Sequence, residues 1–392
     1  MIEVVSLFRE QDTRDELGIG SIRDALADFF FPGTTTLQTR ARYFLLVPWM
    51  YTYYENRKVS SEKIAGRLRQ DEIRLIDTLK EAGETGVIGE RSGISLHRFP
   101  SSIYWKGLQR WGVCRFLGTT EQYHRSLDRW YEGNRQSSQA DDYFSPGQIY
   151  NWDPDLPVRP AEDSAGTHLS LTVTEARYLR ECLRLNCTGS LITVLVENTD
   201  PVDDTVTFPW LHPQMDMFPL DLKDKLEHAR NFSESIHGAA LLYNLMLAEK
   251  ADQEELVTNY SEELQTWWNE MNLRSKAWKK WDRLAFWSFA TCLGRIPYMT
   301  QSFADRWLDA LLGANGITKP EKSKTMMSLV ENRERSLKRA RSRFVSQRHL
   351  ELWSGAASAG QIDFRWRVAK GITNDILRGL NSNRKDRHAR SR

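Results

Sequence analysis

The residues best suited to chemistry in this 392-residue sequence form a run of basic side chains near its C-terminus. The spacing of apolar residues, Met326 and Val330 among them, predicts one continuous helix over 324–348. Its expected nucleic-acid-binding side chains are Arg335, Lys338, Arg339, Arg341, Arg343 and Arg348. Long cationic side chains along a rigid rod suit the phosphates of DNA or RNA. The alternative is a solvated helix face whose arginines pair with acidic parts of the same chain.

Arg230 and His237 offer a second kind of chemistry. Seven positions on a helix bring both side chains to one face, where histidine can act as acid or base and arginine can stabilise a phosphorane. The spacing resembles the active-site motif of the all-helical HEPN ribonucleases, which implies RNA cleavage by this pair. The chain has three such spacings, about as many as its arginine and histidine content predicts by chance. The alternative is that His237 packs beside 238–240 in a tight helix contact.

Motifs for metals and cofactors are not indicated. Cys182 and Cys187 have no second Cys or His pair nearby, as a zinc site would require. The glycines of 18–20 lack the third glycine and the preceding strand of a dinucleotide fingerprint, and there is no phosphate-binding loop with Gly-Lys-Ser/Thr. We therefore expect neither a metal nor a cofactor.

Charge is divided unevenly along the chain. Residues 319–392 hold 19 Lys/Arg against 7 Asp/Glu, so the remainder holds 35 against 45 of the total 54 and 52. Such a basic end predicts a polyanionic partner or docking on an acidic surface. The basic tail 381–392 could follow a phosphate backbone.

Composition places the chain among globular proteins, with 40% hydrophobic and 27% charged residues and 14 Trp. The most apolar run, 43–54, contains Pro48 and is shorter than the roughly 20 residues that a membrane span needs. No secretory signal is recognised, and four cysteines indicate no disulfide framework. These features predict a cytoplasmic protein without a membrane segment.

The elements that must position these residues are mostly helices. Apolar periodicity predicts helices at 21–30, 37–57 and 220–250, and the best strand-like runs are 169–173 and 192–196. The fold class expected is mainly α, with few short strands and a basic C-terminal helix and tail. Proline, serine and aspartate are frequent over 132–166, which predicts a linker between an N-terminal helical domain (1–131) and a C-terminal one (167–392).

Several segments resemble an uncharacterised bacterial family of unknown function. They are 16–25, 31–34, 37–44, 100–105, 237–244 and 364–366. The resemblance extends over nearly the whole chain and implies no catalytic residues. The family is similar to proteins encoded beside helicase-like and phospholipase-D-like genes in bacterial defence clusters, which implies other defence-system proteins as partners. Its members begin with more sequence before Ser6, which implies that this chain starts at a downstream methionine or lacks an opening strand.

We therefore expect a non-enzymatic, nucleic-acid-associated or scaffolding subunit of a bacterial defence system. One alternative is a helical ribonuclease using Arg230 and His237. The other is an interaction module whose basic end binds an acidic partner.

Overall fold

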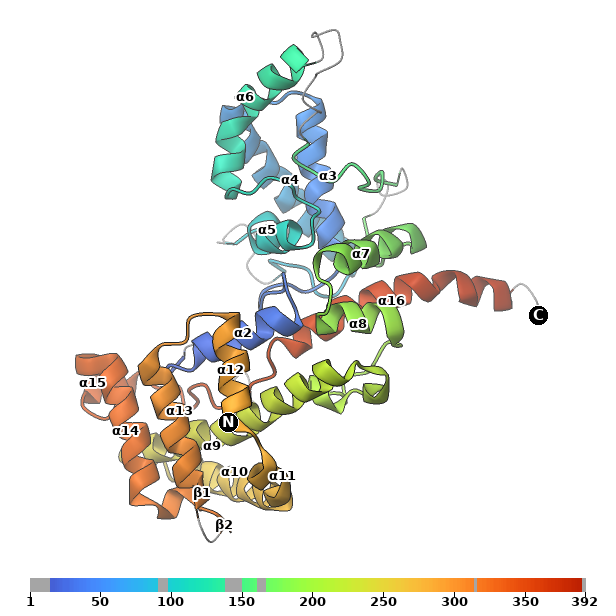
Figure 1. The fold of residues 1–392 in the computed structure, drawn as a ribbon. Helices are drawn as coiled ribbons and strands as arrows, with labels where there is room; N and C mark the ends of the chain where they lie inside the picture. Colours follow the sequence, from blue (N-terminus) through green and yellow to red (C-terminus); the bar gives the residue numbers. More distant parts are fainter. Residues whose placement is uncertain (1–14, 91–97, 138–149, 161–166, 314–315, 390–392) are drawn as a thin grey trace. The chain divides into compact units, whose positions relative to one another are not determined.

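The computed structural model describes residues 15–90, 98–137, 150–160, 167–313 and 316–389 and is mainly α-helical, as the sequence predicts (Figure 1). Within these ranges, the strands are β1 (Leu312–Gly313) and β2 (Gly316–Ile317), which pair antiparallel. Contacts divide the chain into two units, and neither is continuous in sequence. Unit 1 contains Met1–Ala27 and Pro219–Phe364, and unit 2 contains Asp28–Phe218 and Arg365–Arg392.

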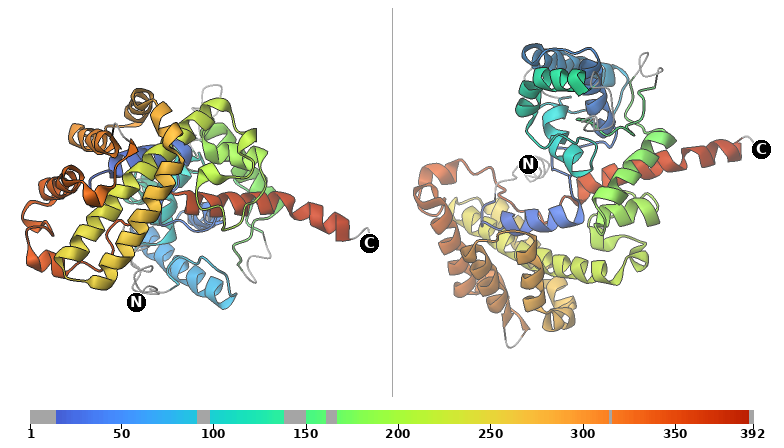
Figure 2. Two further views of the ribbon diagram at one scale, coloured as in Figure 1. Left: turned by 90° about the horizontal axis from the view of Figure 1, so that it is seen from below. Right: turned by 45° about the horizontal axis from the view of Figure 1, so that its top comes forward.

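Unit 1 is built on two long helices that lie side by side, α9 (Leu220–Lys250) and α10 (Glu254–Leu273) (Figure 2). The helix predicted over 220–250 is confirmed. The two helices meet closely at Gly238, where any Cβ would overlap the ring of Trp267 on α10. The indole N–H of Trp267 donates to the Glu234 carbonyl at 2.7 Å, which fixes the ring in that position.

The remaining elements of unit 1 follow α10 along the chain. They are α11 (Ser275–Lys280), α12 (Arg283–Leu293), α13 (Tyr298–Leu311), β1, β2, the 3₁₀ turn η5 (Pro320–Lys322), α14 (Lys324–Lys338), η6 (Arg339–Arg341) and α15 (Gln347–Glu351). Helix α2 (Gly20–Phe30) begins in unit 1 and ends in unit 2. It confirms the helix predicted over 21–30.

Unit 2 consists of helices from both ends of the sequence. They are α3 (Tyr43–Asn56), α4 (Ser61–Glu81), α5 (Pro100–Arg110), α6 (Thr120–Ser137), α7 (Val173–Asn186), α8 (Leu191–Asn198), η3 (Pro209–Leu211), η4 (Met215–Met217) and α16 (Trp366–Ala389). Helix α3 packs on α4 and α5, and α16 packs on α7 and α8. Most of the basic tail belongs to α16, whose side chains beyond 382 lie outside the described residues.

Two arginines of the segment 37–44 hold unit 2 together. Arg42 is fully buried and makes a two-pronged ion pair with Glu175 at the start of α7, with N–O distances of 2.8 and 3.2 Å. Arg40 pairs with Asp375 of α16 at 2.9 Å, and the same carboxylate accepts the Ala41 N–H. The residues ahead of α3 therefore form ionic ties to α7 and α16, and α3 begins later than the predicted residue 37.

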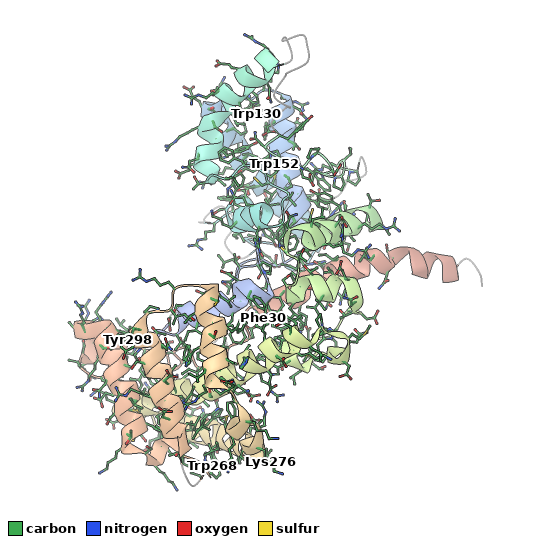
Figure 3. All side chains as sticks on the ribbon, in the orientation of Figure 1. Phe30, Trp130, Trp152, Trp268, Lys276 and Tyr298 are labelled. Carbon is green, nitrogen blue, oxygen red and sulfur yellow. The ribbon has the colours of Figure 1, made fainter. Side chains whose placement is uncertain are left out.

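The core of unit 2 contains buried acids. Glu72 on α4 is 3% exposed, and its carboxylate accepts the backbone N–H of Ser101 at 2.7 Å, at the N-terminus of α5. Burial raises the pKa of Glu72 to about 7. Trp152 is also buried in this unit, beside Trp105 and Tyr123, as part of an aromatic cluster (Figure 3).

Both strand predictions are wrong. Residues 192–196 lie in α8, and the run 169–173 contains an irregular stretch followed by the first residue of α7. The residues of α8 from 191 to 196 are all buried, so their apolar run has no alternation that would separate a helix from a strand.

The predicted linker 132–166 belongs wholly to unit 2. In its described part, the Asp153 N–H donates to the Val113 carbonyl at 2.9 Å and the Arg115 N–H donates to the Asn151 carbonyl at 2.8 Å. Residues 138–149 and 161–166 lie outside the described residues. The domain boundary at this segment stays a prediction.

Candidate nucleic-acid interface

The predicted helix 324–348 is interrupted at Arg339, so the prediction of one continuous basic helix is wrong. Helix α14 ends at Lys338, and Arg339 has a φ of 52° and a ψ of −120°, which the interior of an α-helix does not accommodate. The chain then turns back, because the buried carboxylate of Glu334 accepts the Ser342 hydroxyl and the Arg343 backbone N–H, the latter at 2.9 Å. A side chain inside α14 thus holds the segment that follows it.

Two of the six predicted cations belong to a buried ion network. Arg343 pairs with Glu16 at 2.8 Å and donates to the Tyr243 hydroxyl at 3.0 Å. Lys338 pairs with Glu16 and lies 3.7 Å from Glu334. Both carboxylates are at most 2% exposed, so their charges need these cations. For these two residues, the structure agrees with the alternative that the basic side chains pair with acids of the same chain.

Arg333, which lies on α14, also binds groups of the same chain. The residue is 7% exposed, and its guanidinium donates to the carbonyls of Leu17 and Gly18 at 2.8 and 3.1 Å. Burial lowers the pKa of Arg333. Gly18 has a φ of 67°, and a Cβ at this position would lie 2.5 Å from the guanidinium. The segment 16–25 is therefore shaped to receive this arginine.

The other four predicted cations are exposed. Arg335 forms an exposed pair with Glu331 at 2.6 Å. Arg339, Arg341 and Arg348 have no acidic partner within the described ranges. Residues 335–350 contain six Lys/Arg and no Asp/Glu. Once the buried network is neutralised, this surface keeps a positive charge at the turn between α14 and α15.

The structure gives Arg230 and His237 separate partners. Arg230 pairs with Glu234 on its own helix at 2.7 Å. A ring nitrogen of His237 lies 3.0 Å from the Ala359 carbonyl, within hydrogen-bonding distance. His237 is half-buried and next to Gly238, where α9 meets Trp267. These contacts favour structural roles for both side chains.

Sequence reasoning missed a second basic region, the stretch 274–283. It contains five Lys/Arg, one Asp and two Trp, an alternation of cations and aromatic rings that could have been recognised. Trp278 and Trp281 line a cavity of about 300 Å³ together with Lys279 and Arg283. The hairpin of β1 and β2 forms its other wall.

Other kinds of site are not indicated in the part of the chain that the structure describes. No three His, Cys, Asp or Glu side chains converge there as metal ligands would. Among the described helices, none is long and apolar enough to cross a membrane.

The sequence matches the model of a family of unknown function, DUF6361, over residues 2–377. The chain belongs to this family. The predicted resemblance to an uncharacterised family is thereby confirmed. No curated protein matches the chain, and no solved structure matches it. In this DUF6361 chain the segments that carried the resemblance make structural contacts: 16–25 receives Arg333, and 37–44 supplies Arg40 and Arg42.

Proposed function

We propose that this protein is a non-enzymatic nucleic-acid-binding subunit of a larger assembly, and that its contact surface is the basic turn formed by Arg335, Arg339, Arg341 and Arg348. The resemblance to proteins of bacterial defence clusters suggests the kind of assembly. The observation that carries the proposal is the exposure of Arg339, Arg341 and Arg348 without carboxylate partners among the described residues.

The charge arithmetic of the turn supports this function. In the buried network two cations, Lys338 and Arg343, balance two carboxylates, Glu16 and Glu334. Arg335 is balanced by Glu331. Three guanidiniums are left over on one short stretch, and three phosphates of a nucleic acid would neutralise them.

The backbone at Arg339 is a further support. A non-glycine residue with a φ of 52° and a ψ of −120° costs about 1–3 kcal/mol, and such strain collects at functional sites. Glycine would hold this turn without strain, yet the chain has an exposed arginine here. A role for its charge explains that choice.

The non-enzymatic part of the proposal is supported by the contacts of Arg230 and His237. The guanidinium is paired with Glu234 and the imidazole lies within hydrogen-bonding distance of a backbone carbonyl. Neither arrangement prepares a general base for an incoming hydroxyl. RNA cleavage by the purified wild type that is lost in His237→Gln would refute this part.

The direct test measures binding across salt. Replacing Arg339, Arg341 and Arg348 by Gln removes up to three phosphate contacts from duplex DNA, so the slope of log K against log salt should flatten by about 2.7 units. At 0.15 M salt this corresponds to roughly a hundredfold loss of affinity. Fluorescence anisotropy with single- and double-stranded DNA and RNA gives both quantities.

The matched control changes the same charge elsewhere. Lys63, Arg67 and Lys80 on α4 are exposed and have no acidic partner in the described part of the chain, so their triple Gln variant also lowers the net charge by three. It should keep wild-type affinity and slope. Equal losses in the two triple variants would show that only net charge matters. Binding of poly-glutamate in place of nucleic acid would instead identify an acidic protein partner and refute the proposal.

A further inference from the structure

The cavity of unit 1 lies between α11, the start of α12 and the hairpin of β1 and β2. Its volume of about 300 Å³ is at the lower end of the range for small-molecule sites. Lys276 of α11 and Trp268 of α10 lie at this end of the unit (Figure 3). The Trp268 N–H donates to the Ile317 carbonyl at 2.9 Å, which ties the hairpin wall to α10.

The aromatic wall is held in place before any ligand arrives. Trp281 donates its N–H to a ring nitrogen of His228 at 2.9 Å and packs on Phe286, with 5.4 Å between the ring centroids. Trp278 meets Trp281 edge to face at 5.8 Å. Trp281 remains partly exposed, whereas Trp278 is 2% exposed and its Nε1 is covered. A planar ligand would therefore lie mainly against Trp281.

The polar side of the cavity has one cation that is unpaired in the described ranges and one arginine that belongs to an ion pair. Lys279 is exposed and has no carboxylate partner among the described residues, and Arg283 is partly exposed beside Asp309 at 2.6 Å. The opposite wall includes Gly313 and Gly316, and a Cβ at 316 would meet nothing within 4 Å.

We propose that this cavity binds one nucleoside phosphate, with its base against Trp281 and its phosphate at Lys279 and Arg283. An aromatic ring beside the ammonium of Lys279, which is unpaired among the described residues, matches the two halves of such a ligand, and Arg283, which is balanced by Asp309, adds guanidinium donors, since bases stack on indoles and phosphates pair with ammonium and guanidinium groups. The ligand is either a free nucleotide or one nucleotide of a single strand. The inference does not rest on the proposed function, because the basic turn at Arg339 contributes none of the lining residues.

Two neighbouring lysines provide the matched test. Lys279 lines the cavity and Lys280 does not, although both are exposed and unpaired in the described ranges. Isothermal titration of the full chain with adenosine monophosphate should show about tenfold weaker binding for Lys279→Gln, the loss of a charge-assisted contact that is partly screened by solvent. Lys280→Gln should bind as the wild type does. Equal weakening in both variants would overturn the proposal.

The chemistry of the ligand is tested with its two halves. Adenosine and inorganic phosphate should each bind at least tenfold more weakly than adenosine monophosphate, because each reaches only one side of the cavity. Ser275→Phe, which adds a ring to the lining without changing charge, should abolish binding while the melting temperature stays within a few degrees. Inorganic phosphate that binds as well as the nucleotide, or no binding of the nucleotide at millimolar concentration, would overturn the proposal.

Competition identifies the source of the ligand. A single-stranded oligonucleotide that displaces adenosine monophosphate from a variant lacking the charges of Arg339, Arg341 and Arg348 supports a strand as the ligand. Failure to displace it, with nucleotide binding intact, supports a free nucleotide. If this variant loses nucleic-acid affinity but retains nucleotide binding, the cavity and the basic turn are independent sites.

Discussion

Arg339 is the residue at which stability and binding should respond in opposite directions. Its φ of 52° and ψ of −120° suit glycine, so Arg339→Gly relieves about 1–3 kcal/mol of strain. The glycine lowers the gain by about 0.5–1 kcal/mol because it has more freedom in the unfolded chain. The expected net stabilisation is about 1 kcal/mol, or roughly 2–4 °C in the melting temperature of a unit of this size.

The same change removes one exposed charge from the proposed interface. One lost phosphate contact flattens the salt slope by about 0.9 units, which at 0.15 M salt is roughly a fivefold loss of affinity. Most substitutions that weaken binding leave stability unchanged or lower it. A variant that becomes more stable while binding more weakly therefore separates the function of Arg339 from any structural role.

Two companion variants isolate the two effects. Arg339→Ala removes the charge but keeps the strain, so it should bind like the glycine variant and be less stable than it by about 1 kcal/mol. Arg339→Lys keeps both and should resemble the wild type. Calorimetry and anisotropy on the same preparations measure the two quantities. Equal melting temperatures for the Gly and Ala variants would refute the backbone argument, and wild-type affinity in both would refute the contact.

Three further predictions concern a buried acid, the buried ion network and the segment 132–166. Burial raises the pKa of Glu72 to about 7, so the folded protein keeps this proton to higher pH than the unfolded chain does, and the free energy of unfolding should fall as pH rises from about 4.5 through 7. Urea unfolding of Glu72→Gln should lack that fall, and at pH 8 this variant should be up to about 3 kcal/mol more stable than the wild type. Arg343→Gln leaves only Lys338 to balance the two buried carboxylates, Glu16 and Glu334, and should cost about 3–5 kcal/mol, whereas Arg348→Gln should change the free energy of unfolding by under about 0.5 kcal/mol. A similar cost for both variants would contradict the buried network. Limited proteolysis should cut first within 132–166, and a first cut inside α9 with 132–166 resistant would reject that segment as a linker.

Local patterns were sufficient for the longest helix, α9. The stripe that includes Leu222, Leu226 and Ile236 predicted α9 with the bounds that the structure shows, because many periodic positions outweigh local noise. Short apolar runs were ambiguous, and α8 shows why: a helix buried on all sides has the same composition as a buried strand. The break in the basic helix was beyond local reasoning, because every residue from 335 to 341 tolerates a helix.

The basic surface shows what separates a structural cation from one that is available to a ligand. Arg343 and Arg348 lie five residues apart in one charge run, and no local pattern distinguishes them. Arg343 is buried because Glu16, more than 300 residues away in sequence, needs a cation, whereas Arg348 forms no ion pair with the acids of the described residues. Lys279 and Lys280 are divided in the same way, by the cavity that only one of them lines. In both cases tertiary contacts, and not residue type, decide which charges can meet a phosphate. The variants that test function are therefore made at Arg348, which is exposed, and at Lys279, which lines the cavity.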